Sequence, residues 1–392
     1  AQAAKFDRVV AALQPDVLAL QEIGFDTPLQ DVLDLMDAIE PIAGGWHGHK
    51  AGDCVILSRW PLSMKASETV PEGDKDQAMA LVDLPDAQWP ADLYVMNNHY
   101  KCCGGNDHRR QEQSDSIIAW MRDARAPGGA IDLAPNTPMI VLGDLNIVDG
   151  LQPVQTLIDG NIIDESVFGP DSPPDWDATD SLDAHPLHNV SGPADWTWYS
   201  PGPFPPGVLD YIISTDSVLE QVYAYTLNTT TMSAAELAAT GLQPNDVTVD
   251  SQGQAFDHLP LVADFRPPVE IWDSVGAGLA GSTGMPELGG AGALTAGGPV
   301  SWSLAGALPG AGAWFVVGFS ALNAPFKSGV LVPAPDLVLG SLPVDGDGEL
   351  ALAFTWPGGA PSGLVVWVQA WIADSGAAAG FAASAAIEAS TP

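Results

Sequence analysis

The 392-residue sequence has few basic residues. Only 13 Lys and Arg stand against 49 Asp and Glu, which gives a formal net charge of -36 at pH 7. A charge of this size favours solubility and opposes long-range attraction of polyanions. A broad basic groove for nucleic acid is therefore excluded, and a nucleic-acid partner would need bound divalent cations and a small local basic cluster.

Cysteine is also scarce. Of the 3 cysteines, Cys54 stands alone and Cys102 is adjacent to Cys103. This spacing excludes a scaffold held together by disulfides and fits no zinc site. A strained disulfide between the two adjacent cysteines stays open.

Long apolar segments are missing. The sequence has no run of about 18 or more apolar residues, and its first residues lack the charged-then-apolar pattern of a signal peptide. We therefore expect a monomer with no membrane span. We also expect it to be secreted, periplasmic or at the cell surface, with an export signal already removed.

The composition changes near residue 268. Up to Pro268 there are 12 basic and 40 acidic residues, whereas beyond it Lys327 alone is basic against 9 acidic residues. The second region consists of short apolar runs separated by turn residues, at 313–321, 329–340, 349–356 and 363–373. This pattern predicts a first domain over 1–268 and an accessory all-β sandwich over 269–392.

The first region mixes both kinds of secondary structure. Helical periodicity covers 5–13 and 109–125. Apolar strand candidates cover 16–22, 53–58, 92–99, 138–146, 208–215 and 258–265. Strands with helices between them predict packed α/β layers, and the Asp-, Pro- and Ser-rich stretch over 164–196 is expected to be a long loop at a functional rim.

Polar side chains border these apolar strands: Glu22, His99, Asp144, Asn146, Asp210, Asp257 and His258. Asp144 and Asn146 are two residues apart and lie on the same side of an extended backbone. Buried ionisable groups are costly unless they are paired or bind metal. Because Mg²⁺ prefers carboxylate and amide oxygens and leaves positions for phosphate, the pattern predicts a metal-assisted phosphoryl site.

Five short motifs occur in a fixed order: LQEI (20–23), NNHYK (97–101), GDLN (143–146), VLDYI (208–212) and DHLP (257–260). Together they resemble the endonuclease/exonuclease/phosphatase superfamily, which includes deoxyribonuclease I. The resemblance covers roughly residues 1 to 266. It implies a four-layer sandwich of two packed mixed β-sheets flanked by helices, and hydrolysis of phosphoesters with Mg²⁺, or with Mn²⁺ or Ca²⁺.

The resemblance also implies roles for single residues. The expected metal ligands are Glu22, Asp257 and Asp144. The expected catalytic residues are His99, Asp144, Asn146, Asp210 and His258, with Asp210 fixing the tautomer of His258. The substrate phosphate is expected to meet Lys101, Arg109, Asn146 and Trp198, and Asp76 is expected to orient His99. Arg110, which opens the expected helix beside Arg109, is more typical of a solvated face.

Two departures from the family pattern stand out. The first core strand, which carries an asparagine in a WN-type motif, has no counterpart before Ala1, so the chain is expected to lack one strand and one site group. The closing motif reads FDH where SDH is usual.

Three functions therefore stay open. The first is a phosphodiesterase or nuclease, with DNA or RNA as substrate. The second is hydrolysis of a small or lipid-like phosphoester, such as a phosphomonoester, phosphotriester or sphingomyelin, at the same site. The third is a catalytically degenerate binding protein at the cell surface.

Overall fold

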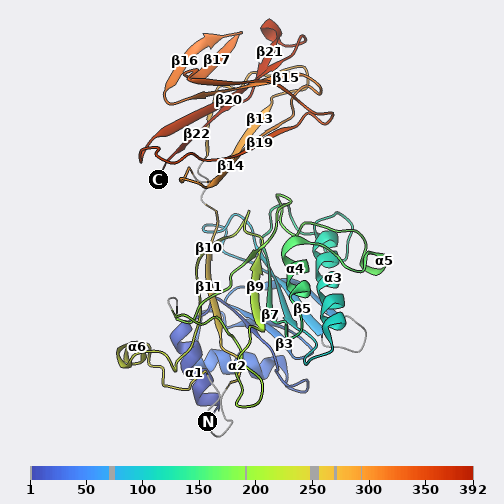
Figure 1. Ribbon diagram of the computed structural model, residues 1–392, viewed down its shortest axis with the longest axis vertical. Coiled ribbons are helices and arrows are strands. Elements are labelled where there is room, and N and C mark those ends of the chain that lie inside the picture. The colour runs from blue at the N-terminus through green and yellow to red at the C-terminus, as the bar shows by residue number, and fades with distance from the viewer. Residues whose placement is uncertain are drawn as a thin grey trace. The chain divides into compact units, whose positions relative to one another are not determined.

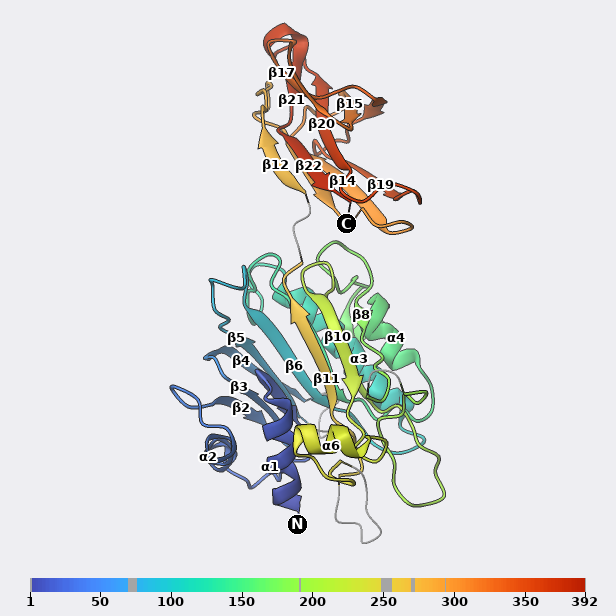
Figure 2. The ribbon, with the colours of Figure 1, turned by 90° about the vertical axis from the view of Figure 1, so that its left-hand side faces the viewer.

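The chain divides into two compact units, Ala1–Pro268 and Val269–Pro392, in the computed structural model (Figures 1 and 2). The structure describes residues 2–69, 76–189, 192–247, 256–268, 272–292 and 294–391. Each unit has its own hydrophobic cores.

The largest sheet of the first unit has six strands in the order β4-β5-β6-β7-β9-β8, of which β6 and β7 run parallel. These strands are β4 Leu62–Thr69, β5 Asp76–Val82, β6 Leu93–His99, β7 Met139–Asp144, β8 Leu182–Asp183 and β9 Asp210–Ser214. Two smaller antiparallel sheets have the orders β1-β3-β2 and β10-β11. Their strands are β1 Val17–Leu20, β2 His47–Ala51, β3 Cys54–Ser58, β10 Glu220–Thr226 and β11 Leu261–Arg266.

Helices cover both sides of these sheets. They are α1 Gln2–Leu13, α2 Leu29–Ile39, α3 Asp107–Ala124, α4 Gln152–Asp159, α5 Glu165–Phe168 and α6 Ala234–Thr240. Helices α3 and α4 lie together on one face of the six-stranded sheet (Figure 1), where Ile117 and Ile118 share a core with Met96. The expected helix over 109–125 and the α/β character are confirmed, and the 164–196 stretch contains the short elements α5 and β8.

The other face of the six-stranded sheet packs on the smaller sheets. Val95 and Ile140 share a core with Ile56 of β3, because β3 and β6 are buried along their whole lengths. On the far side of β3, Leu57 packs against Met36 of α2. Layers of helix, sheet, sheet and helix result. Two mixed sheets were expected. Among the described residues, β6 and β7 form the one parallel pair between named strands, so the six-stranded sheet alone is mixed.

The second unit is antiparallel throughout its described ladders. Its larger sheet has the order β12-β22-β20-β15-β18, with β21 beside β20, and β13-β14-β19 and β16-β17 form two more sheets. The bounds are β12 Asp273–Gly276, β13 Glu287–Ala291, β14 Pro299–Ala305, β15 Gly312–Gly318, β16 Ala321–Phe326, β17 Gly329–Pro333, β18 Leu337–Pro343, β19 Leu350–Thr355, β20 Val365–Ala373, β21 Phe381–Ala383 and β22 Ala386–Ser390. Trp302 of β14 stacks on Phe315 of β15 in a core shared by the two larger sheets.

No helix in the described part of the chain is both long enough and apolar enough to cross a membrane.

Candidate active site

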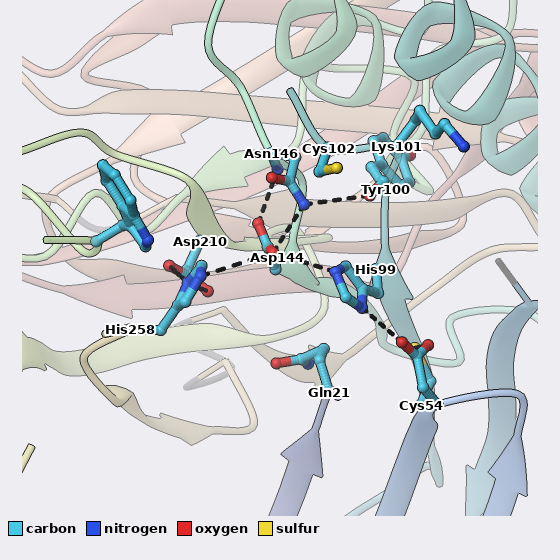
Figure 3. A network of polar contacts seen from close by, with 12 residues as sticks. Gln21, Cys54, His99, Tyr100, Lys101, Cys102, Asp144, Asn146, Asp210 and His258 are labelled. Carbon is cyan, nitrogen blue, oxygen red and sulfur yellow. Dashed lines mark hydrogen bonds and ion pairs between the residues drawn. The ribbon is translucent and has the colours of Figure 1, made fainter. Parts of the chain in front are cut away.

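Sheet register brings three of the predicted residues together. β6 pairs with β7 so that His99 lies opposite Asp144, and β7 pairs with β9 so that Asp144 lies opposite Asp210. The three side chains therefore come from adjacent strands at one edge of the six-stranded sheet (Figure 3). Asp144, at the centre, is 4% exposed.

A tight turn after β7 joins Asp144 to Asn146. The Asn146 backbone N–H donates to Asp144 Oδ1 at 2.9 Å, and its side-chain amide donates to Asp144 Oδ2 at 2.8 Å and to the Tyr100 carbonyl at 3.2 Å. Gly143 makes this path sterically feasible. Its φ is +124°, and a Cβ added there would lie 2.1 Å from the Asn98 carbonyl oxygen. The GDLN motif thus fixes both functional groups.

His258 is held by a chain of hydrogen bonds. Its Nδ1 lies 2.9 Å from Asp210 Oδ2, and the Thr197 hydroxyl donates to the same Oδ2 at 2.6 Å. Because a carboxylate accepts, Nδ1 carries the hydrogen and Nε2 faces Asp144 Oδ2 at 3.9 Å. The predicted pairing of Asp210 with His258 is present in the structure.

His99 has a carboxylate partner that the sequence did not suggest. Its Nδ1 lies 2.9 Å from Asp53 Oδ2, and its Nε2 lies 3.4 Å from Asp144 Oδ2. Asp53 precedes β3, where its backbone carbonyl also accepts from the Ile23 amide at 3.1 Å. Asp53 therefore has the role expected of Asp76, whose side chain lies outside the described part.

The electrostatics of the cluster follow from its burial. Burial, and then the neighbouring Asp210 carboxylate, raise the pKa of Asp144 to about 7, although both histidines oppose this. Burial alone would lower the pKa of His258. The hydrogen bond to Asp210 and the charges of Asp210 and Asp144 outweigh burial and raise it to about 9. Carboxylates that burial forces together are groups that a bound cation would stabilise.

One group in the described residues has the geometry of a metal site: Asp144, Asp210 and His258, whose ligand atoms all lie within 4.8 Å of one another. Of the three predicted metal ligands, only Asp144 belongs to it. The carboxylate oxygens of this group suit a hard cation such as Mg²⁺ or Mn²⁺. The residues present therefore fit a divalent metal.

Glu22 and Asp257 are outside that group. β1 ends at Leu20, two residues earlier than the expected strand, and Glu22 is exposed with φ +61°. Asp257 is half-buried, and its Oδ2 accepts from Trp198 Nε1 at 3.3 Å. A metal role for either stays a prediction, and Trp198 orients Asp257 in the structure.

The basic residues separate into two kinds. Lys101 and Arg109 are half-buried and stay candidates for contact with phosphate. Arg110, which the sequence places on a solvated face, is 0% exposed instead. Its guanidinium donates to the carbonyls of Lys101 and Cys103, both at 3.0 Å, and to Asp149 at 2.7 Å. Arg110 therefore holds a loop.

Asp144 thus lies between two histidines, each bonded to its own Asp, at one edge of the six-stranded sheet. The sequence profile of the Endonuclease/Exonuclease/phosphatase family matches residues 1–230, and this chain belongs to that family. Its members are metal-dependent phosphoester hydrolases. The predicted family is thereby confirmed.

Solved structures give further, distant matches. Truncated Caenorhabditis elegans TDP2 is 13% identical, with 67% of this chain and 90% of that chain covered and a TM-score of 0.44. The human Nocturnin catalytic domain with bound sulfate is 17% identical (68% and 86% covered, TM-score 0.41). ANGEL2, a 2',3'-cyclic phosphatase, in complex with adenosine-2',3'-vanadate is 16% identical (68% and 86%, TM-score 0.45). A search of curated proteins finds no match.

Proposed function

We propose that this chain hydrolyses phosphoesters, phosphodiesters above all, with a divalent cation. The observation that carries the proposal is the pair of His–Asp dyads on the two sides of Asp144. His99 and His258 both donate from Nδ1 to an Asp and direct Nε2 at Asp144 Oδ2, at 3.4 and 3.9 Å. Two fixed imidazoles around one buried carboxylate can serve proton transfer on both sides of a phosphorus atom.

Asp144 and Asp210, the two carboxylates grouped with His258, are the residues that would hold the metal, with Glu22 and Asp257 as further ligands by family resemblance. Mg²⁺ is the first choice, with Mn²⁺ or Ca²⁺ as alternatives. When bound, such a cation acts as a Lewis acid that stabilises charge on phosphate oxygens, an effect of several kcal/mol.

The protein groups supply orientation and proton transfer. His258 orients the attacking water or, as a cation, contacts a phosphate oxygen, and Asp210 with Thr197 keeps its ring in place. Both amide hydrogens of Asn146 are used by Asp144 and the Tyr100 carbonyl, so its side chain has no hydrogen left for the phosphate that it was expected to contact and instead orients Asp144. His99, held by Asp53, contacts a phosphate oxygen or protonates the leaving oxygen. Lys101, Arg109 and Trp198 line the approach of the phosphate.

A substrate panel tests the proposal. DNA, RNA, bis-p-nitrophenyl phosphate, p-nitrophenyl phosphate and sphingomyelin are each incubated with Mg²⁺, Mn²⁺ or Ca²⁺, and with EDTA. We expect EDTA-sensitive release of product from a phosphodiester. If no substrate shows such activity, the chain is instead the degenerate binding protein, and the proposal is wrong.

A second candidate function is hydrolysis of an amphiphilic phosphoester. Large apolar side chains stand exposed on the segments that carry site residues: Phe25 is 68% exposed three residues after Glu22, and Val148 is 49% exposed two residues after Asn146. Tyr199 is exposed beside Trp198. Exposed apolar side chains on these segments, together with a net charge of -36, suit a neutral or zwitterionic lipid phosphoester better than a polyanion.

Comparison of two substrates distinguishes the candidates. In the amphiphilic case, Phe25→Ser with Val148→Ser lowers the rate on sphingomyelin vesicles at least about tenfold and leaves the rate on bis-p-nitrophenyl phosphate within about twofold. Val167→Ser is the matched control, because Val167 is 68% exposed in α5 and follows no site residue. Equal losses on both substrates would exclude the amphiphilic candidate.

We also propose that the protein is a monomer that acts outside the cytoplasm, as a secreted, periplasmic or cell-surface protein. Both statements rest on the sequence, through its acidic composition and the expectations drawn above from its lack of long apolar runs. Fractionation of the producing cells tests the location, and light scattering of the purified chain tests whether it is a monomer.

A further inference from the structure

Cys102 and Cys103 form an exposed pair at the edge of the candidate active site. They follow Tyr100 and Lys101, and their Sγ atoms are 2.7 Å apart. A covalent disulfide has an S–S distance of about 2.05 Å. The two sulfur atoms are therefore within a small movement of bonding distance.

The surrounding loop holds the two cysteines in this position. The Asn106 amide donates to the carbonyls of Cys102 at 2.8 Å and Cys103 at 3.4 Å, and the buried Arg110 donates to the Cys103 carbonyl at 3.0 Å. Cys103 has φ +75°, which is uncommon for a residue with a side chain. The approach of the thiols is thus built into the backbone path.

We propose that Cys102 and Cys103 form a reversible disulfide, a redox-modification site that the hydrolytic function does not require. The oxidant is a low-molecular-weight disulfide. One cysteine thiolate attacks it, so that its S–S bond breaks, one small thiol leaves and a mixed disulfide forms. The second cysteine thiolate then attacks the first Sγ, the protein S–S bond forms and the other small thiol leaves. Two protein thiols are oxidised and one small disulfide is reduced to two thiols.

The bond is expected to be easily reduced. Adjacent Cα atoms across a trans peptide are about 3.8 Å apart, below the separation of about 4.4 to 6.8 Å usual for disulfides. Strained, exposed disulfides have more oxidising potentials than structural ones and are the labile kind. The pair is therefore suited to respond to its redox surroundings.

The same segment reaches the phosphoester site. The Tyr100 amide donates to the Asp144 carbonyl at 2.8 Å, and the Tyr100 carbonyl accepts from the Asn146 amide at 3.2 Å. Lys101, next along the chain, lies in the same network (Figure 3). Ring closure at the cysteines therefore changes the backbone immediately beside the residues proposed to contact phosphate.

The test uses the whole chain in glutathione buffers of graded reduced-to-oxidised ratio, followed by thiol counting and peptide mass mapping. We expect oxidising buffers to remove two of the three thiols. The mass of the chain should fall by two hydrogens, with no glutathione attached, and dithiothreitol should restore both thiols. Cys54 is the internal control, because it is 0% exposed and should react only after denaturation. Cys102→Ser should instead trap a mixed disulfide on Cys103.

Three results would overturn the proposal. They are glutathione added separately to Cys102 and Cys103, a disulfide between two chains, or thiols that stay reduced in every buffer. Circular dichroism tests whether Cys102→Ser is folded. If this variant does not fold, the mass map of the wild-type chain decides whether the disulfide forms. None of these readouts requires phosphoesterase activity, so failure here is distinct from failure of the proposed function.

Discussion

The two units of this chain treat a buried carboxylate in opposite ways. In the first unit, burial and Asp210 raise the pKa of Asp144 to about 7. In the second unit, Asp374 is also buried, with 2% of its surface exposed. Hydrogen bonds from Ser282 and from the Gly376 and Ala377 amides nevertheless hold the pKa of Asp374 below its ordinary value. A carboxylate surrounded by donors stabilises a turn, whereas one beside another carboxylate is poised for cation or proton binding.

The distribution of charge follows the same division. The first unit has 12 of the 13 basic residues, and one of them, Arg110, holds the loop that follows His99. The second unit has one, Lys327, whose ammonium lies over the Phe381 ring. Its core is formed by apolar and aromatic side chains. The chemistry is therefore expected from the first unit alone, with the second as a stabilising or attaching module.

The strongest test of this division removes an aromatic core residue from the second unit. Trp302 is 3% exposed and contacts Phe315 and Phe354. Trp302→Ala should cost about 3–5 kcal/mol of the unfolding free energy of that unit, because a large buried ring is lost. Calorimetry should show one transition lowered and the other unchanged, with the hydrolysis rate retained. A lost rate in a folded first unit would contradict the division.

Substitutions at the two contrasting carboxylates come next. Asp144→Asn, or His258→Ala, should lower kcat/KM at least about a hundredfold, which corresponds to about 2.7 kcal/mol of transition-state stabilisation. Asp374→Asn is the matched control and should leave kcat/KM unchanged. Glu22→Gln, measured in parallel, decides whether Glu22 joins the metal ligands. Unchanged rates in both Asp144→Asn and His258→Ala would refute the site.

Metal binding should affect one unit only. At a free Mg²⁺ or Mn²⁺ concentration ten times its Kd, the first unit should gain about 1.4 kcal/mol, since a ligand of the native state stabilises by RT ln(1 + [L]/Kd). The second unit should not respond. Scanning calorimetry with and without EDTA measures both transitions, and Asp144→Asn should abolish the gain.

The last prediction concerns the protonation of His258 in the metal-free protein. Because its folded pKa is raised to about 9, protonation contributes stability that is fully present below about 6.5, the unfolded pKa, and is lost as pH rises through 9. Asp210→Asn removes the carboxylate that bonds the ring but leaves the burial and the charges of Asp144 and Asp257, so the pKa should fall from about 9 toward the ordinary value. NMR titration of the imidazole in EDTA measures this. A pKa still near 9 would show that Asp210 is not the cause.

Much of the site could be predicted from sequence because its residues lie at the ends of apolar strands. Asp144 ends β7, Asn146 follows it, and Asp210 begins β9. Asp53 could not be found in this way. It meets His99 only because the sheets pack, across 46 positions of sequence. Its one local signal is a charged residue directly before a strand that is buried throughout.

Other misjudged features have similar causes. Helical position suggested that Arg110 faces solvent, but three acceptors from a distant loop and a neighbouring turn draw it inside. The strand expected to reach Glu22 stops at Leu20, because Glu22 adopts a φ of +61°, outside the extended region of a regular strand. Interactions between distant segments and local backbone reversals are the features that composition and periodicity do not encode.

Gly143 gives the site a weakness that is independent of its reactive groups. Any side chain at this position would collide with the Asn98 carbonyl and force β6 away from β7. Random mutagenesis should therefore identify Gly143 as intolerant, although it donates no proton and binds no ion. In a survey of inactivating mutations, Gly143 should therefore appear with Asp144 and His258, although a list of the reactive groups of the site would not include it.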